Sequence, residues 1–134
     1  MNNIIPVTAA IIERDGRVLI AQRKPGDTLE QLWEFPGGKL KFGERPEDGI
    51  VREIQEELGM AITVTGLFAV ESHVYGERHI LLLVYRCKPW PGAEATALDV
   101  GAFAWVEPGE LGRFAFTPAD RPIVAKLQGF VTAI

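Results

Sequence analysis

The stretch Gly38–Met60 reads GKLKFGERPEDGIVREIQEELGM, and the spacing of its acidic residues is its most informative feature. Glu53, Glu56 and Glu57 are spaced i, i+3 and i+4, so a helix places all three on one face. Like charges at this spacing weaken a helix by roughly a few tenths of a kcal/mol. A bound divalent cation would offset this repulsion, because Mg²⁺ prefers carboxylate and carbonyl oxygens as ligands. A solvated acidic face is the simpler interpretation of an isolated run of this kind. The positions around the run favour a cation site instead.

The whole stretch follows a nine-position pattern, GX5EX7REUXEEXGU, in which U is a bulky apolar residue. The fixed positions are Gly38, Glu44, Arg52, Glu53, Ile54, Glu56, Glu57, Gly59 and Met60. At average residue usage, a chance match at one starting point is on the order of 10⁻⁹. The pattern resembles the Nudix box, so the chain resembles a Nudix hydrolase. Such enzymes cleave a pyrophosphate bond in a nucleoside diphosphate that is linked to another moiety.

The local signals predict a helix from Pro46 to Leu58, because proline suits the first turn and Gly59 suits the stop. Arg45 is a poor N-cap for this helix. A second helix is predicted from Pro118 towards Phe130, with Thr117 as its cap. Strands are predicted at residues 4–13, 18–22, 33–35, 62–75, 79–87 and 103–106, with a hairpin turn at 14–17 and a break at Pro36-Gly37-Gly38. These elements predict an α/β/α sandwich with a mixed sheet, the box helix on one side and the C-terminal helix on the other. The Nudix resemblance implies the same architecture.

Composition narrows the functional class. A chain of 134 residues suits one domain, which we expect to span residues 1–134. A net charge of −4 without a basic run argues against a nucleic-acid polymer as partner. The longest apolar run, Ile80–Tyr85, has six residues, so we expect no membrane segment. The single Cys87 cannot form an internal disulfide, which favours a reducing, cytoplasmic setting. We expect a monomer or a homodimer.

The resemblance implies a Mg²⁺ cofactor, with Mn²⁺ as a substitute. The implied metal ligands are the Gly37 carbonyl and the side chains of Glu53, Glu56, Glu57 and Asp99. The catalytic set that the resemblance implies is Glu53, Arg52 and Glu44, in which Glu53 accepts a proton from water and Arg52 orients a carboxylate. Asp99 lies six residues before Trp105, where several relatives carry glutamate. Asp99 is therefore an alternative base or metal ligand, or a routine loop residue.

Outside the box, from about Ile5 to Leu127, the chain resembles the mutator-type (MutT-type) nucleoside triphosphate pyrophosphohydrolases. The substrate-binding residues that this implies are Arg23, Glu34, Phe35, Pro36, Gly37, Arg78 and Asp120. Arg23 matches a phosphate-binding arginine. Asp120 stands where relatives specific for 8-oxo-dGTP carry asparagine. An ionised aspartate only accepts hydrogen bonds, so it suits cytosine N4 or adenine N6, whereas a protonated one suits oxidised purines.

The predicted function is Mg²⁺-dependent hydrolysis of a nucleoside or deoxynucleoside triphosphate to the monophosphate and pyrophosphate. We expect the substrate to be CTP, a modified dCTP or 8-oxo-dGTP, and the role to be cleansing of the nucleotide pool. One alternative is hydrolysis of another nucleotide conjugate, such as ADP-ribose, a dinucleoside polyphosphate or a sugar nucleotide. A second is a non-catalytic Nudix domain that senses nucleotides. Such domains usually lose box glutamates, and this chain keeps them.

Overall fold

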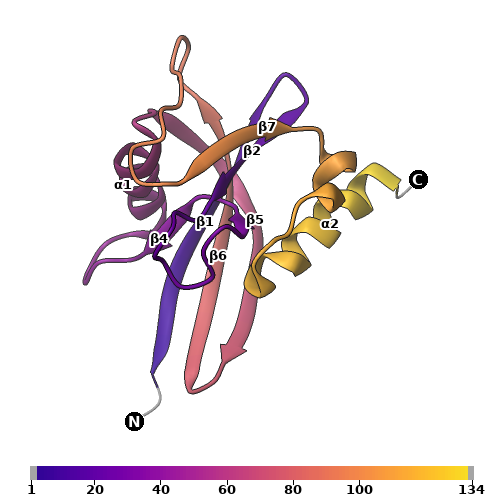
Figure 1. The fold of residues 1–134 in the computed structure, drawn as a ribbon. Helices are drawn as coiled ribbons and strands as arrows, with labels where there is room; N and C mark the ends of the chain where they lie inside the picture. The colour runs from indigo at the N-terminus through magenta and orange to yellow at the C-terminus, as the bar shows by residue number, and fades with distance from the viewer. Residues whose placement is uncertain (1–2, 133–134) are drawn as a thin grey trace.

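The computed structural model describes residues 3–132, with side chains up to Gly129, and its centre is a mixed β-sheet. Within these residues the sheet has the order β3-β2-β1-β6-β5, while β4 pairs with β1 and β7 pairs with β2 (Figure 1). Only β1 and β6 run parallel; the other described pairs are antiparallel. The strands are β1 (Ile4–Arg14), β2 (Arg17–Gln22), β3 (Trp33–Glu34), β4 (Gly37–Lys39), β5 (Ile62–Tyr75), β6 (Arg78–Pro89) and β7 (Ala102–Val106).

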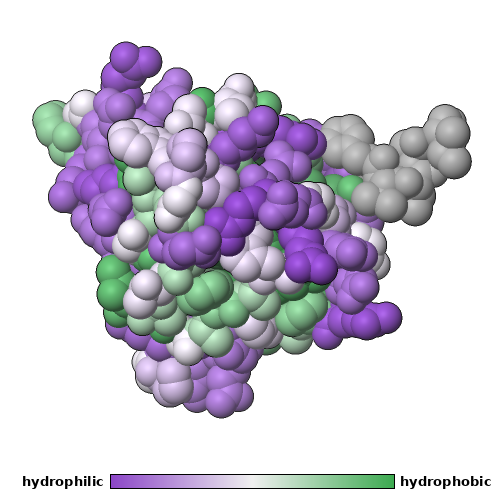
Figure 2. Space-filling view, turned by 90° about the horizontal axis from the view of Figure 1, so that it is seen from above, coloured by the Kyte–Doolittle hydropathy of each residue, from purple (hydrophilic) through white to green (hydrophobic). Residues whose placement is uncertain are grey.

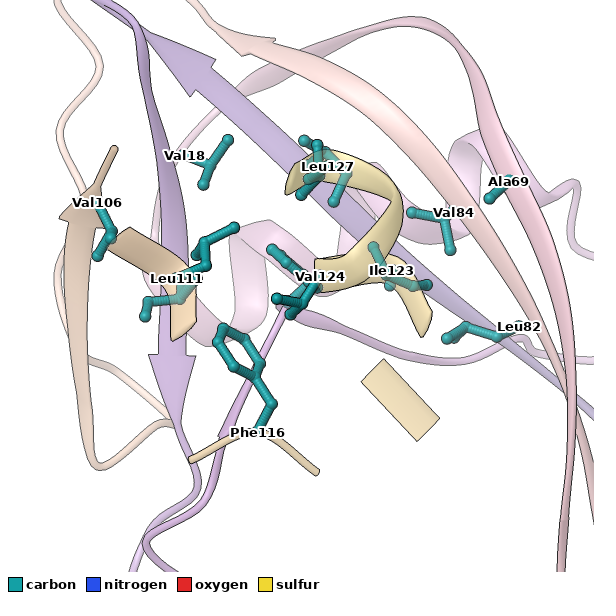
Figure 3. Close-up of a cluster of buried hydrophobic side chains, with 14 residues drawn as sticks. Val18, Ala69, Leu82, Val84, Val106, Leu111, Phe116, Ile123, Val124 and Leu127 are labelled. Atoms are coloured by element: carbon teal, nitrogen blue, oxygen red, sulfur yellow. The ribbon is translucent and has the colours of Figure 1, made fainter. Parts of the chain in front are cut away.

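Two helices cover opposite sides of this sheet, α1 (Pro46–Leu58) and α2 (Arg121–Thr132) (Figure 1). Side chains alternate between the two faces of a strand, and β1 shows how this divides the core. Ala9 and Ile11 belong to the buried cluster under α2, which also contains Ile123 and Leu127 (Figure 3). Ala10 and Ile12 belong to the cluster under α1, with Ile50, Ile54 and Leu58. The predicted sandwich, with one helix on each side, is confirmed.

Helix α1 has the predicted bounds, and its two ends behave as their residues dictate. Gly59 adopts φ 62° and donates its N–H to the Gln55 carbonyl at 3.0 Å, which is the left-handed stop that glycine favours. Arg45 makes no capping hydrogen bond with its side chain. Ile50 is fully buried and Val51 is 38% exposed, so Ile50 is the residue of the pair that joins the core.

Two predicted elements were wrong in detail. The strand predicted at 33–35 does end before Pro36, as β3, but Gly37 and Gly38 do not belong to the break, because Gly37–Lys39 pairs with β1 as strand β4. The last helix starts at Arg121, since Pro118–Asp120 forms a short 3-10 helix, η2, in which the Asp120 N–H bonds to the Thr117 carbonyl at 3.0 Å. An α-helix through this point would need a backbone N–H on Pro122, and proline has none. Thr117 makes no side-chain cap bond. A second 3-10 helix, η1, spans Pro108–Arg113.

The surface is mixed in character. Figure 2 shows one face of the molecule, on which apolar side chains gather in the lower half between hydrophilic ones. Among residues 3–132, neither helix has the length and hydropathy that crossing a membrane would require.

Candidate active site

Arg52, in the middle of α1, holds three of the box carboxylates together. Its Nε and Nη2 donate to the two oxygens of Glu44 at 2.8 and 2.9 Å. Its Nη1 reaches Glu53 at 2.9 Å and Glu56 at 3.2 Å, and Nη2 also donates to the Lys39 carbonyl at 3.1 Å. A guanidinium fork binds carboxylates strongly because its donors are charged and fixed in a plane. These bonds keep the pKa of Glu44 at about 2 and raise that of Arg52.

The two glycines of β4 allow close approach on two sides: Gly38 faces Glu53 of α1, and Gly37 faces the main chain of β1 at Thr8. A Cβ placed on Gly38 would lie 2.5 Å from the Glu53 Oε2, so any larger residue would displace that carboxylate. The Gly37 N–H donates to the Glu57 Oε1 at 3.1 Å, and the Thr8 hydroxyl donates to the Gly38 carbonyl at 3.1 Å. Strand β4 therefore lies directly against the acidic face of the helix.

Few groups in the site offset the negative charge that Glu57 carries when it is ionised. Burial is the main cause that raises its pKa, to about 8, and repulsion from Glu34, Glu53 and Asp99 adds to it. The hydrogen bond from Gly37 acts in the opposite direction. The backbone N–H of Asp99 bonds to the Glu57 carbonyl at 3.0 Å, which brings the two predicted metal ligands into neighbouring positions.

Lys24 pairs with the side chain of Asp99, and sequence reasoning missed it. The pair raises the pKa of the Lys24 ammonium. Only the position of Lys24 beside Arg23 could have signalled its place in the site. Thr8 was missed as well, although a buried hydroxyl in an apolar strand is a usable signal, because such a group needs a hydrogen-bond partner.

The donor set suits a hard divalent cation, because it consists of carboxylate and carbonyl oxygens with excess negative charge. Among residues 3–132, however, no three acidic, histidine or cysteine side chains converge on a point where they could hold one ion. Glu53 and Glu56 pair with Arg52 instead, and Asp99 pairs with Lys24. The metal set of Gly37, Glu53, Glu56, Glu57 and Asp99 stays a prediction.

Two cavities lie beside this region. The first, about 310 Å³, is mostly apolar, and its lining includes Ile80, Leu82, Phe35 and Asp120. The second, about 260 Å³, is polar, and its lining includes Lys24, Asp27, Glu57 and Asp99. Three residues line both cavities: Arg23, Glu34 and Gly37. The apolar and the acidic regions are therefore adjacent.

An ion pair stands where the two cavities meet. Arg23 Nη1 contacts Glu34 Oε1 at 2.6 Å, and Arg23 Nε donates to the Thr28 carbonyl at 2.6 Å. Burial raises the pKa of Glu34, while the guanidinium of Arg23 opposes that effect. Arg23, predicted to bind phosphate, thus already has a carboxylate partner.

Asp120 lines the apolar cavity and is 5% exposed. Its Oδ2 accepts the Phe35 N–H at 3.0 Å, and the Phe35 ring stacks on Phe116 with ring centroids 5.4 Å apart. Burial raises the pKa of Asp120 to about 7, with repulsion from Glu34 as the next cause. The carboxyl group can therefore change its protonation state near neutral pH.

Two predicted substrate residues lie outside the cavity linings. Pro36 is buried, and its carbonyl accepts the Ala10 N–H at 2.8 Å. Arg78 is exposed at the start of β6, next to the β5–β6 turn, whereas Ile80 on the same strand reaches the apolar cavity. A substrate role for Pro36 and Arg78 stays a prediction.

Known proteins match this chain along most of its length. A model of the NUDIX domain matches residues 7–126. The chain belongs to the NUDIX domain family. It is 37% identical to the CTP pyrophosphohydrolase of Escherichia coli (strain K12), over 90% of this chain and 89% of that protein. It is 31% identical to the 8-oxo-dGTP diphosphatase of the same strain, over 92% of this chain and 96% of that protein.

Two further likenesses agree with this assignment. A MutT-like protein of Streptomyces ambofaciens is 37% identical to this chain. The matched region covers 80% of this chain and 66% of that protein. The crystal structure of a MutT NUDIX hydrolase from Burkholderia pseudomallei has a TM-score of 0.82 at 30% identity, covering 92% of this chain and 97% of that one. The predicted family, fold class and enzyme class are confirmed, and this Nudix hydrolase has relatives of the MutT type.

Replacing Glu57 tests the unbalanced charge in this Nudix hydrolase. The pKa values of Glu57 and Asp120 in the fold, about 8 and about 7, exceed their ordinary values of 4.5 and 3.8. The folded state therefore binds more protons than the unfolded state between those limits, and its stability falls as pH rises from about 4 to about 8. Thermal denaturation in EDTA should show that Glu57→Gln melts above the wild type at about pH 8 and declines less steeply with pH. Glu56→Gln, at a side chain that is 53% exposed, should follow the wild-type curve. A wild-type melting temperature that rises steadily over this range would contradict the assignment.

Replacing Gly38 tests the close approach of β4 to α1. In Gly38→Ala the new methyl group displaces the Glu53 carboxylate, so hydrolysis of a nucleotide phosphoanhydride should slow by about 10- to 100-fold. The matched variant is Gly109→Ala, since a Cβ there meets nothing within 4 Å. It should keep the wild-type rate, and circular dichroism should show both variants folded. A Gly38→Ala enzyme as fast as wild type would mean that the position of Glu53 does not matter.

Proposed function

We propose that this Nudix hydrolase converts a nucleoside or deoxynucleoside triphosphate and water into the monophosphate and pyrophosphate, with Mg²⁺ as cofactor and Mn²⁺ as a substitute. The observation that carries the proposal is the pair of adjoining cavities, one apolar and one lined by carboxylates. A nucleotide has the same two halves, because a planar base is joined through a sugar to an anionic phosphate chain. Concave apolar sites with a few polar groups are the usual form of small-molecule sites.

The acidic residues would serve the phosphate end. The Gly37 carbonyl and Glu53, Glu56, Glu57 and Asp99 would hold the cation. When bound, it supplies positive charge to the phosphate oxygens and offsets the repulsion around Glu57.

Transfer to water needs orientation and a proton acceptor rather than a covalent nucleophile. The water oxygen bonds to one of the two phosphorus atoms that flank the anhydride bond between the first and second phosphates. That bond breaks, and the monophosphate and pyrophosphate separate. Glu53 accepts the proton of the water, while Arg52 keeps the Glu53 carboxylate in place with the help of its bonds to Glu44. Asp99 is the alternative base.

The apolar cavity would hold the base, with Asp120 reading its edge. Two relatives, named a CTP pyrophosphohydrolase and an 8-oxo-dGTP diphosphatase, support cytosine and oxidised guanine nucleotides as the substrates to compare. The ionised Asp120 accepts from the cytosine N4 amine, and the protonated form can also donate to an oxidised purine. Hydrolysis of either kind of damaged or surplus nucleotide would cleanse the nucleotide pool.

Product analysis tests the reaction. With Mg²⁺, the enzyme should release pyrophosphate and monophosphate from CTP, 5-methyl-dCTP, dGTP or 8-oxo-dGTP, and EDTA should abolish turnover. Glu57→Gln should lower kcat by about 100-fold or more, as loss of a charge-stabilising group does. Glu94→Gln, the same change on the 74% exposed side chain that pairs with Arg14, should retain the rate.

Orthophosphate as the only product would contradict the proposal. A higher kcat/KM on ADP-ribose, a dinucleoside polyphosphate or a sugar nucleotide would replace the substrate class. Nucleotide binding without turnover at any Mg²⁺ or Mn²⁺ concentration would indicate a sensing domain.

Replacing Asp120 tests the reading of the base. An asparagine amide donates as well as accepts, so Asp120→Asn should change the ratio of kcat/KM for CTP to that for 8-oxo-dGTP by about 10-fold or more, in favour of the oxidised purine. Asp99→Asn makes the same chemical change in the polar cavity and should lower both values together. If the ratio stays constant in Asp120→Asn, another residue reads the base.

A further inference from the structure

The loop between β2 and β3 contains two non-glycine residues in the left-handed region. Leu29 has φ 60° and Gln31 has φ 67°. Bulky side chains seldom adopt this conformation, because their Cβ crowds the neighbouring carbonyl. Such strain persists only where the surroundings impose it, and it often accompanies a binding role. The strain at these two residues therefore points to a role for the shape of this loop.

Hydrogen bonds hold the loop in this conformation, from the last residue of β2, from the residue after it and from within the loop. Arg23 Nε donates to the Thr28 carbonyl at 2.6 Å, and the Gln22 side-chain amide donates to the Gln31 carbonyl at 2.9 Å. The Leu32 N–H bonds to the Leu29 carbonyl at 3.2 Å. Because Arg23 also pairs with Glu34 at the junction of the cavities, the loop is tied to the site itself.

The conformation brings one apolar side chain to the apolar cavity. Leu29 lines that cavity together with Ile80 and Leu82 of β6 and Phe35, yet 36% of Leu29 remains exposed. Leu82 and Phe35 are already buried in the core, at 4% and 3% exposed. Leu29 therefore has apolar surface left for a ligand to cover, and it comes from a loop instead of the sheet. Gln31 lines neither cavity.

We propose that Leu29 is a specificity-determining residue, which closes the apolar cavity over the base and so favours a nucleotide over a bare polyphosphate. This inference rests on the proposed function, because it requires the base to occupy that cavity. A leucine side chain gains from covering the face of a planar ring, since both surfaces leave water. Inorganic triphosphate has no such ring and gains nothing from Leu29. The strained backbone is the cost of placing the side chain there.

Three variants separate the side chain from the strain. Leu29→Ala removes the contact and keeps the strain, Leu29→Gly removes both, and Gln31→Gly relieves strain nearby while Leu29 is unchanged. Binding of CMP and 8-oxo-dGMP is measured by calorimetry, and inhibition of turnover by inorganic triphosphate is measured in parallel. Both Leu29 variants should weaken binding of the preferred monophosphate by about 10-fold. They should raise KM with kcat nearly unchanged, and they should leave inhibition by inorganic triphosphate at the wild-type value. Gln31→Gly should bind as the wild type does.

Thermal denaturation supplies a second readout. Leu29→Gly should melt about 4 °C above Leu29→Ala, because glycine adopts the left-handed region without crowding. The reverse order would mean that the residue is not held in that conformation. Wild-type affinity for monophosphate in the Leu29 variants would overturn the proposal, and so would an equal loss of affinity for inorganic triphosphate. Failure of the wild type to release pyrophosphate would instead overturn the proposed function. If the wild type releases pyrophosphate but binds neither monophosphate, the inference about Leu29 is overturned and the proposed function is not.

Discussion

The interaction on which the site depends is the guanidinium of Arg52 between Glu44, Glu53 and Glu56. The Arg52 and Glu44 side chains are only 20% and 15% exposed, so solvent screens this pair less than a surface ion pair. Three carboxylates on or near one turn of helix would otherwise repel each other. Arg52 offsets that repulsion, and its bond to the Lys39 carbonyl also joins β4 to α1. Arg52 therefore ties together the helix, the loop before it and the glycine strand.

Beyond the reach of Arg52, the negative charge is left largely uncompensated. Glu57, Glu34 and Asp120 have raised pKa values, and in each case burial is the main cause. Glu34 lines both cavities, and its charge raises the pKa of Glu57 in the polar cavity and of Asp120 in the apolar one. Arg23 opposes this effect at Glu34. Buried carboxylates with perturbed pKa values in a cleft are typical of functional sites, where a protein tolerates a cost in stability for chemistry.

Much of the fold could be read from local patterns. Helix α1 has the predicted bounds because proline, the apolar spacing and Gly59 act within a few residues of each other. The hairpin between β1 and β2 follows from Asp15-Gly16, whose φ values of 53° and 75° suit such a turn. Strand β4 could not be read this way, because the Gly37–Lys39 segment becomes a strand only through its pairing with β1. The start of α2 was misplaced since the consequence of Pro122 depends on whether the preceding turn is 3-10 or α-helical.

By itself, the sequence determined the family, the box helix and the identity of the acidic residues, because all of these depend on spacing along the chain. Tertiary structure alone decided which of the acidic residues pair with a cationic side chain. Arg52 and Lys24 pair with carboxylates that the sequence had assigned to a cation, while Glu57 is left beside Gly37. It also decided that Asp120, far along the chain, accepts the Phe35 N–H and that a strained Leu29 reaches the same cavity. The physical reason is that burial and charge pairing depend on distances in space, and these are set only when the two faces of the sheet are packed.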